Sequence, residues 1–220
     1  RKLKANARTA DAALQAAWAV MKPGMSELEV ASVIKDSFHA QGVKPLFGIV
    51  GASENGAFPH HQAGETKLKA GDAVVMDIGG SRDGYSSDIT RMAVLGQPPE
   101  GYDEVHEIVD QAVRAALKAA RPGVAAKSVD LAARKVITDA GYGEYFVHRT
   151  GHGLGTEVHE PPYITAASDT LLEEGMVFSI EPGIYLPGRF GIRLEEIVIL
   201  RADGPEILSD LPRDLVTIDV

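Results

Sequence analysis

Apolar residues recur at the spacing of an α-helix in four segments of the chain. These segments cover residues 2–21, 26–40, 101–120 and 125–140. Ser26 and Glu29 stand three positions apart at the start of the second segment, which is the spacing of a capping box. A glycine or a Pro-Gly pair follows each segment closely, and this predicts where each helix ends.

Short runs of apolar and β-branched residues between and after these helices predict strands. The expected strands cover residues 46–51, 73–79, 84–95, 176–181, 191–200 and 205–208. We interpret segment 84–95 as the hairpin or bulged partner of segment 73–79. No low-complexity linker divides the chain, so we expect one α+β domain over residues 1–220.

The two halves of the chain resemble each other. The segment KPGMSELEVASVIKDSFHAQG (22–42) is similar to RPGVAAKSVDLAARKVITDAG (121–141), with matching Pro and Gly residues 99 positions apart. Further on, an acidic residue lies six positions after a glycine in each half, which pairs Asp77 with Glu181. A chance likeness of two Pro-Gly-helix patterns is the alternative. The matched acids favour two related α/β halves, each delivering a carboxylate from the same point on a strand.

Composition narrows the class of protein. Hydrophobic residues make up 45% of the chain and charged residues 24%, as in ordinary globular proteins. The net charge of −9 argues against nucleic acid or an anionic membrane surface as the main partner. There is no cysteine, so disulfides, thiol nucleophiles and cysteine zinc sites are excluded. No apolar stretch has the length of a membrane span and no signal-peptide pattern is present, so we expect a cytoplasmic protein.

Four acidic residues lie in or beside the expected core strands, namely Asp77, Asp88, Glu181 and Glu195. A salt bridge or a strand end would explain any one of them singly. Four carboxylates buried at one place would repel each other and take up protons. Bound divalent cations remove this conflict, so the acids together predict a metal site.

The segment HRTGHGLGTEVHEPP (148–162) supplies histidines for the same site. It places His148, His152 and His159 close together, with glycines around His152 that let the backbone approach a ligand. One histidine with four carboxylates forms an oxygen-rich site, which favours Mn²⁺, Co²⁺ or Fe²⁺ and does not exclude Zn²⁺. Two such ions could share a water and polarise a carbonyl, which suits hydrolysis of an amide or ester.

These motifs resemble those of the pita-bread metallopeptidases, which include methionine aminopeptidase, aminopeptidase P and prolidase. The matching segments are FPHH (58–61), MDIGGSRDGYSSDITR (76–91), HRTGHGLGTEVHEPP (148–162), FSIEPGIY (178–185) and IRLEE (192–196). The resemblance covers nearly the whole chain. It implies two pseudo-symmetric α/β halves around a curved, mainly antiparallel sheet. The phrases GHGLGTEVHE and SIEPGIY look closer to the Xaa-Pro enzymes than to methionine aminopeptidase.

The resemblance also implies how two divalent ions, Mn²⁺ above all, would be held. Asp77 would bind one ion, and His152 with Glu181 would bind the other. Asp88 and Glu195 would bridge the two ions. Glu181 would also accept the proton of a bridging water that attacks the Xaa-Pro peptide bond.

The substrate-facing residues are implied in the same way. His60 and His159 would assist catalysis and contact the substrate, a small peptide with proline at its second position. His148 and Tyr185 would line the proline pocket, and Arg193 would lie near the site. The remaining histidines, namely His39, His61 and His106, are expected to be structural.

Several alternatives remain open on the sequence alone. The chain could be a dipeptidase or an aminopeptidase, and the absence of Arg and Lys from residues 160–175 favours longer peptides. A methionine aminopeptidase-like or other small-amide hydrolase is the second reading, and a non-catalytic binding module is the third. The Xaa-Pro enzymes usually carry an N-terminal domain that often helps to form a dimer, so the resemblance implies a homodimer as one option for this chain. This chain begins at what resembles the first catalytic helix, so we expect that domain to be absent.

Overall fold

A computed structural model describes all 220 residues. The four predicted helices are confirmed as α1 (Lys2–Val20), α2 (Glu27–Ala40), α3 (Tyr102–Ala119) and α4 (Ala126–Asp139). Both bonds of the predicted capping box form at the start of α2. Ser26 Oγ accepts from Glu29 N at 3.1 Å, and Glu29 Oε2 accepts from Ser26 N at 2.6 Å. Two 3₁₀ turns, η1 (Ser53–Ala57) and η2 (Gly143–Tyr145), complete the helical elements.

The strands form two five-stranded sheets and one hairpin. The first sheet contains β1 (Lys44–Ala52), β2 (Ala73–Arg82), β3 (Tyr85–Ser86), β4 (Ile89–Leu95) and β12 (Val216–Ile218). The second contains β5 (Gly151–Gly153), β6 (Glu160–Ile164), β7 (Val177–Ile180), β10 (Glu196–Arg201) and β11 (Gly204–Ile207). The hairpin pairs β8 (Gly183–Leu186) with β9 (Phe190–Arg193). All pairings are antiparallel except that of β12 with β4.

Two predicted strands are divided in the structure, and the divisions fall at predicted ligands. Segment 84–95 separates into β3 and β4 around Asp88, and segment 191–200 separates into β9 and β10 around Glu195. The prediction missed β5, β6, β8 and β12, because each is only three to five residues long and too short to show a clear alternation.

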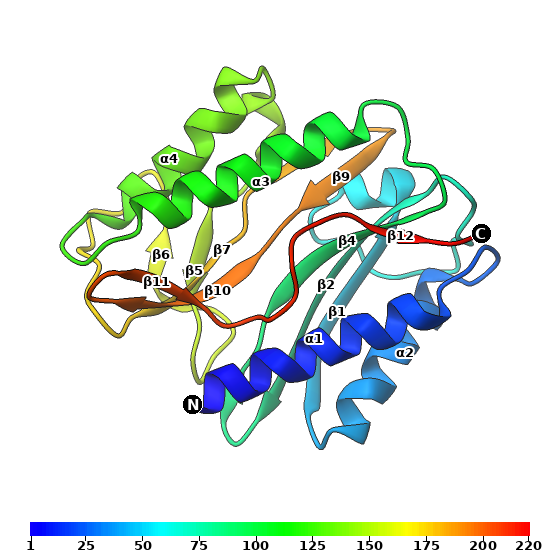
Figure 1. Ribbon diagram of the computed structural model, residues 1–220, viewed down its shortest axis with the longest axis horizontal. Coiled ribbons are helices and arrows are strands. Elements are labelled where there is room, and N and C mark those ends of the chain that lie inside the picture. The colour runs from blue at the N-terminus through cyan, green and yellow to red at the C-terminus, as the bar shows by residue number, and fades with distance from the viewer.

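The predicted pseudo-symmetry is confirmed. In Figure 1, α1 and α2 lie beside the first sheet, and α3 and α4 lie beside the second. The turn before the second helix of each half is closed by the same backbone bond. Gly24 N donates to Leu68 O at 2.8 Å in one half, and Gly123 N donates to Leu172 O at 2.7 Å in the other. The α+β fold of two related halves follows from these matching contacts.

The first sheet is buried on both faces where the halves meet. Every residue of β4 is buried. Ala93 and Leu95 belong to the hydrophobic core under α1 and α2, whereas Met92 and Val94 belong to the core of the second half. This explains why β4 is continuously apolar apart from Thr90 and Arg91, since neither face is open to water.

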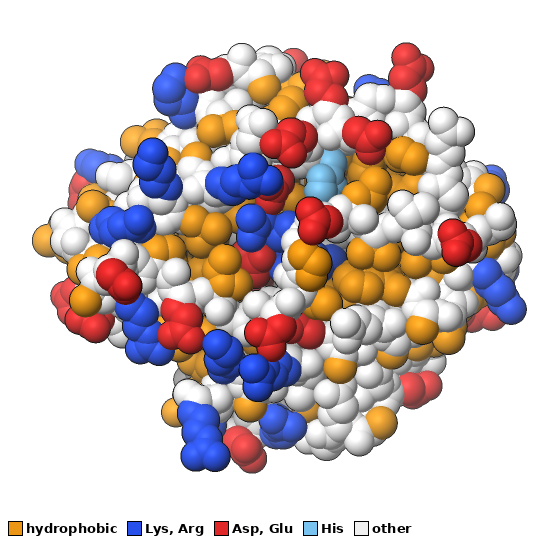
Figure 2. Space-filling model, viewed as in Figure 1, with side chains coloured by type: hydrophobic (Ala, Val, Ile, Leu, Met, Phe, Trp, Pro, Cys, Tyr) orange, Lys and Arg blue, Asp and Glu red, His pale blue; other side chains and the backbone are white.

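Two features relate to the expectation that membranes and nucleic acids are not the main partners: the apolar character of the helices and the charge on the surface. None of the helices combines the length and the apolar character needed to cross a bilayer. On the face drawn in Figure 2, acidic and basic side chains are interspersed, and neither sign covers the face continuously.

The pseudo-symmetry generates a test of helix capping. Ala125 stands before α4 where Ser26 stands before α2, and both have extended backbone, with ψ of 139° and 161°. We expect Ser26→Ala to lower the free energy of unfolding by about 1 kcal/mol, and Ala125→Ser to raise it by about 0.5 kcal/mol. Urea unfolding followed by circular dichroism measures both. Ser128→Ala, on an exposed residue, is the control, and equal stability of all variants would contradict the prediction.

Candidate metal centre

The five predicted ligands come from both halves and meet at their junction. Asp77 lies on β2 and Asp88 between β3 and β4, whereas His152 lies on β5 and Glu181 follows β7. Glu195 stands in the break between β9 and β10. Candidate ligand atoms of Asp88, His152 and Glu195 all lie within 4.8 Å of one another. His152 Nε2 also lies 3.1 Å from Glu181 Oε1.

Unpartnered oxygens test whether these residues fit a cation. Asp77 Oδ1, Asp88 Oδ1 and Glu195 Oε1 are buried and accept no hydrogen bond. A buried polar atom without a partner is costly, so three of them at one centre indicate a place for positive charge. His152 Nδ1 donates to Gly153 O at 3.0 Å, which leaves the lone pair of Nε2 facing the acids. The residues therefore fit divalent cations.

Two hydroxyl groups hold the candidate ligands in place. Ser179 Oγ donates to Glu181 Oε1 at 2.8 Å and accepts from His152 N at 2.9 Å. Thr90 Oγ1 donates to Glu195 Oε2 at 2.7 Å. The sequence analysis missed both residues. Their only signal was a position two residues from a predicted acid, since Thr90 follows Asp88 and Ser179 precedes Glu181 at that spacing.

Burial and mutual repulsion set the charge of the acids without metal. Burial raises the pKa of Asp88 and of Glu195, and the neighbouring carboxylates raise both further. Burial also acts to raise the pKa of Glu181. The hydrogen bond with His152 that forms in the absence of metal and the positive charge of Arg193 outweigh it and lower that pKa to about 2. Asp88 and Glu195 therefore hold protons more readily than Glu181 does.

Arg193 connects the centre to the predicted proline pocket. Its Nη2 donates to Asp77 Oδ2 and its Nη1 to Tyr185 Oη, both at 2.7 Å. Because Tyr185 Oη accepts from Arg193, its own hydrogen is donated to His148 Nε2, also at 2.7 Å. His148 Nδ1 then donates to Arg149 O. Burial lowers the pKa of His148, so these bonds hold a neutral ring in one orientation.

A cavity of about 890 Å³ opens over the centre. Eight of the ten predicted site residues line it: His60, Asp77, Asp88, His148, His152, His159, Glu181 and Arg193. Glu195 and Tyr185 are buried behind its wall. The sequence analysis missed the contributions of β1 residues 46–49 and of Arg149 to the lining. The His159 ring packs edge-on against the His152 ring, with the centroids 4.2 Å apart.

The loop that carries His60 is held by the buried Glu27. The Glu27 carboxylate accepts from Ala52 N at 2.9 Å, from Gly64 N at 3.0 Å and from His61 Nε2 at 2.8 Å. His61 therefore has a structural contact, whereas its neighbour His60 faces the cavity. Glu27 gave no signal in the sequence beyond its place in the first turn of α2.

The other two histidines that we expected to be structural lie apart from the cavity. His39 is exposed in the last turn of α2. His106 lies on α3, where its ring packs near Tyr102, with the centroids 6.0 Å apart.

The raised pKa values of Asp88 and Glu195 predict that metal binding releases protons, because the ions bind the ionised carboxylates. We expect the affinity for Co²⁺ to rise with pH, because fewer protons then have to be displaced from the two carboxyl groups. Isothermal titration calorimetry in two buffers of different ionisation enthalpy measures the release. Asp139→Asn, which changes an exposed acid, is the control. An apparent binding enthalpy that is the same in both buffers would contradict the prediction.

Comparison with known proteins gives the family. The model of metallopeptidase family M24 matches residues 1–202. The probable dipeptidase PepE of Mycobacterium tuberculosis is 48% identical over 90% of this chain and 53% of its own length. The Xaa-Pro dipeptidase of Pyrococcus furiosus is 42% identical over 94% of this chain and 60% of its own length.

A solved structure agrees with these relatives. The crystal structure of the X-Pro aminopeptidase from Thermotoga maritima superimposes with a TM-score of 0.96 at 40% identity, over 99% of this chain and 62% of that one. The chain thus spans little more than half to about three fifths of the proteins it matches. The matched residues and the shared fold confirm the resemblance inferred from the motifs: the chain belongs to the pita-bread metallopeptidases of family M24.

Proposed function

We propose that this chain hydrolyses the peptide bond before proline in small peptides, with two divalent ions at the candidate centre. The observation that carries the proposal is the set of buried carboxylate oxygens without partners at the floor of the cavity. The relatives named Xaa-Pro dipeptidase and X-Pro aminopeptidase support the substrate class.

The donor set supports hard or borderline divalent ions, and we propose Mn²⁺ first. Asp77 would hold one ion and His152 with Glu181 the other, and Asp88 and Glu195 would be shared between the two. When bound, such ions polarise the peptide carbonyl and make a water more acidic. The Asp77–Arg193 contact supports this division, because Asp77 keeps its Oδ1 free while Arg193 binds its Oδ2.

Three side chains carry out the proton and carbonyl chemistry in this proposal. Glu181 accepts the proton from the attacking water as an ionised carboxylate. His159 lies beside His152 at the cavity wall and steadies the scissile carbonyl. His60, on the opposite loop, contacts the substrate and passes a proton towards the leaving proline nitrogen.

His148 and Tyr185 form the proline pocket in this proposal. A neutral, fixed imidazole offers a flat apolar face to the pyrrolidine ring without the cost of desolvating a charge. The bond from Tyr185 Oη to His148 Nε2 supports this role, since it uses the ring nitrogen that would otherwise bind water.

Arg149 bears on the length of the substrate. It lines the cavity, and its guanidinium lies over the Tyr163 ring, 4.8 Å from the centroid, without an acidic partner. We propose that Arg149 binds the C-terminal carboxylate of an Xaa-Pro dipeptide. Arg149 lies outside residues 160–175, the segment whose lack of Arg and Lys favoured longer peptides. It supplies a positive charge for the dipeptide carboxylate from another part of the chain.

A peptide panel tests both substrate class and length. The chain is treated with chelator, reloaded with Mn²⁺, Co²⁺ or Zn²⁺, and assayed with Ala-Pro, Ala-Pro-amide, Ala-Pro-Gly and Met-Ala-Ser. We expect cleavage of the proline peptides and KM lowest for Ala-Pro. Cleavage of Met-Ala-Ser alone would contradict the proposal and support the methionine aminopeptidase reading.

The same panel tests Arg149. We expect Arg149→Met to raise KM for Ala-Pro by about 10-fold or more, because a charge-assisted hydrogen bond is lost. KM for Ala-Pro-amide, which has no carboxylate, should stay unchanged. Arg189→Met is the matched control, because Arg189 also stacks on an aromatic ring, that of Phe190. Equal effects on both peptides would rule out the assignment.

Loss of a bridging carboxylate should stop turnover without unfolding the chain. We expect Asp88→Asn to abolish hydrolysis, and Glu181→Gln to do the same. The raised pKa of Asp88 means that a neutral side chain already suits the metal-free fold, so circular dichroism should change little. Activity and bound metal are measured together, with Asp139→Asn as control. Full activity in Asp88→Asn at unchanged metal content would refute the role of this residue.

A further inference from the structure

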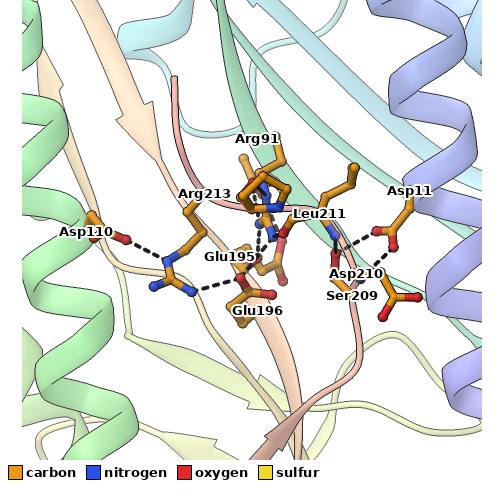
Figure 3. Close-up of polar contacts among 11 residues, drawn as sticks. Asp11, Arg91, Asp110, Glu195, Glu196, Ser209, Asp210, Leu211 and Arg213 are labelled. Carbon is orange, nitrogen blue, oxygen red and sulfur yellow. Dashed lines mark hydrogen bonds and ion pairs between the residues drawn. The ribbon is translucent and has the colours of Figure 1, made fainter. Parts of the chain in front are cut away.

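The segment of residues 209–213, here called the C-terminal strap, crosses from the second sheet to the first between β11 and β12 (Figure 1). Ser209 Oγ donates to Asp11 Oδ1 on α1 at 2.6 Å. Arg213 Nε donates to Asp110 Oδ1 on α3, also at 2.6 Å. Figure 3 shows these two contacts on opposite sides of the strap. The strap is therefore attached to one helix of each half.

Arg91, on β4, binds the middle of the strap (Figure 3). Its side chain is only 1% exposed. Its N–H groups donate to five acceptors, namely the carbonyl oxygens of Thr90, Glu195, Leu211 and Pro212 and the carboxylate of Glu196. A guanidinium has five N–H donors, so every donor is used and the group has a single orientation.

One of these acceptors belongs to a candidate metal ligand. Glu195 stands in the break between β9 and β10. Three bonds hold it there. Glu195 N donates to Thr90 O at 3.2 Å, Oε2 accepts from Thr90 Oγ1 at 2.7 Å, and the carbonyl accepts from Arg91 Nη1. Arg91 thus fixes the backbone from which the Glu195 carboxylate projects.

We propose that Arg91 is a positioning residue for Glu195, and that the strap takes part in metal binding by holding Arg91 in place. The carbonyl oxygens of Leu211 and Pro212 orient the guanidinium, and the guanidinium in turn orients Glu195. The inference rests on the proposed metal centre but not on the proposed peptide specificity. The strap contains none of the metal ligands, yet by this inference it contributes to the affinity of the centre for metal.

Arg213 provides the contrast between positioning and simple stabilisation. It also binds Glu196 Oε1, at 3.0 Å, and forms a second ion pair with Asp110. Its hydrogen bonds and ion pairs go to Asp110 and Glu196 and not to Glu195. Replacing either arginine removes ionic bonds to the second half, but only Arg91 forms a hydrogen bond with a candidate ligand. Lysine keeps the charge and has three donors in place of five, so it cannot reproduce the Arg91 contacts.

The test compares Arg91→Lys with Arg213→Lys in the full chain, using Co²⁺ after chelation. We expect Arg91→Lys to weaken Co²⁺ binding by about 10–100-fold and to alter the visible absorption of the bound ion. Arg213→Lys loosens one end of the strap but leaves the five Arg91 bonds in place, so it should lower the unfolding midpoint, weaken Co²⁺ binding much less than Arg91→Lys does, and leave the spectrum as in the wild type. Unchanged Co²⁺ binding in Arg91→Lys, or an equal loss in both variants, would overturn the proposal.

A measurement on the unaltered chain covers the case in which Arg91→Lys fails to fold. If the strap favours metal binding, the metal must stabilise the strap by the same free energy. Co²⁺ should therefore slow hydrogen exchange at Asp210 N, which donates to Asp11 Oδ2. Exchange that is unaffected there while strand amides become protected would count against the proposal. A wild-type chain that binds Co²⁺ without cutting Xaa-Pro peptides contradicts the proposed specificity alone.

Discussion

The crowding of buried carboxylates at the junction of the two halves constrains the rest of the structure. Each acid needs a compensating group, since ionised carboxylates removed from water and placed together repel each other. The guanidinium of Arg193 compensates the negative charge of Asp77. Thr90 donates a hydrogen bond to Glu195, and Ser179 donates one to Glu181. The oxygens left without partners mark where cations complete the balance. Because the acids come from both halves, that balance exists only when the halves are closed on each other.

The Arg193 side chain couples this charge balance to the shape of the pocket. The same guanidinium binds Asp77 and Tyr185, and Tyr185 fixes the ring of His148. A change of charge at Asp77 therefore affects His148, the residue that we assign to the proline ring, through three hydrogen bonds in series. The charge at Asp77 and the orientation of the His148 ring in this cavity therefore depend on each other.

The sequence was most informative where the signal was local. Helices followed from apolar spacing, the start of α2 from Ser26 and Glu29, and the site from acids on apolar strands. The break before Glu195 and the role of Arg91 were not predictable, because they depend on contacts between residues about one hundred positions apart. The roles of the site residues, the single-domain boundary, the cytoplasmic location and the homodimer stay predictions.

The contacts of Arg91 and Thr90 also bear on how two related halves became one protein. Leu95 and Leu200, which make the same turn bond to Asp72 O and Met176 O, are 105 positions apart. Arg91 and Glu196 share that spacing, so equivalent positions face each other as unlike residues. In a symmetric pair of identical halves, a buried arginine would meet a second arginine. The two halves are therefore complementary to each other at this position and unsuited to pairing with copies of themselves.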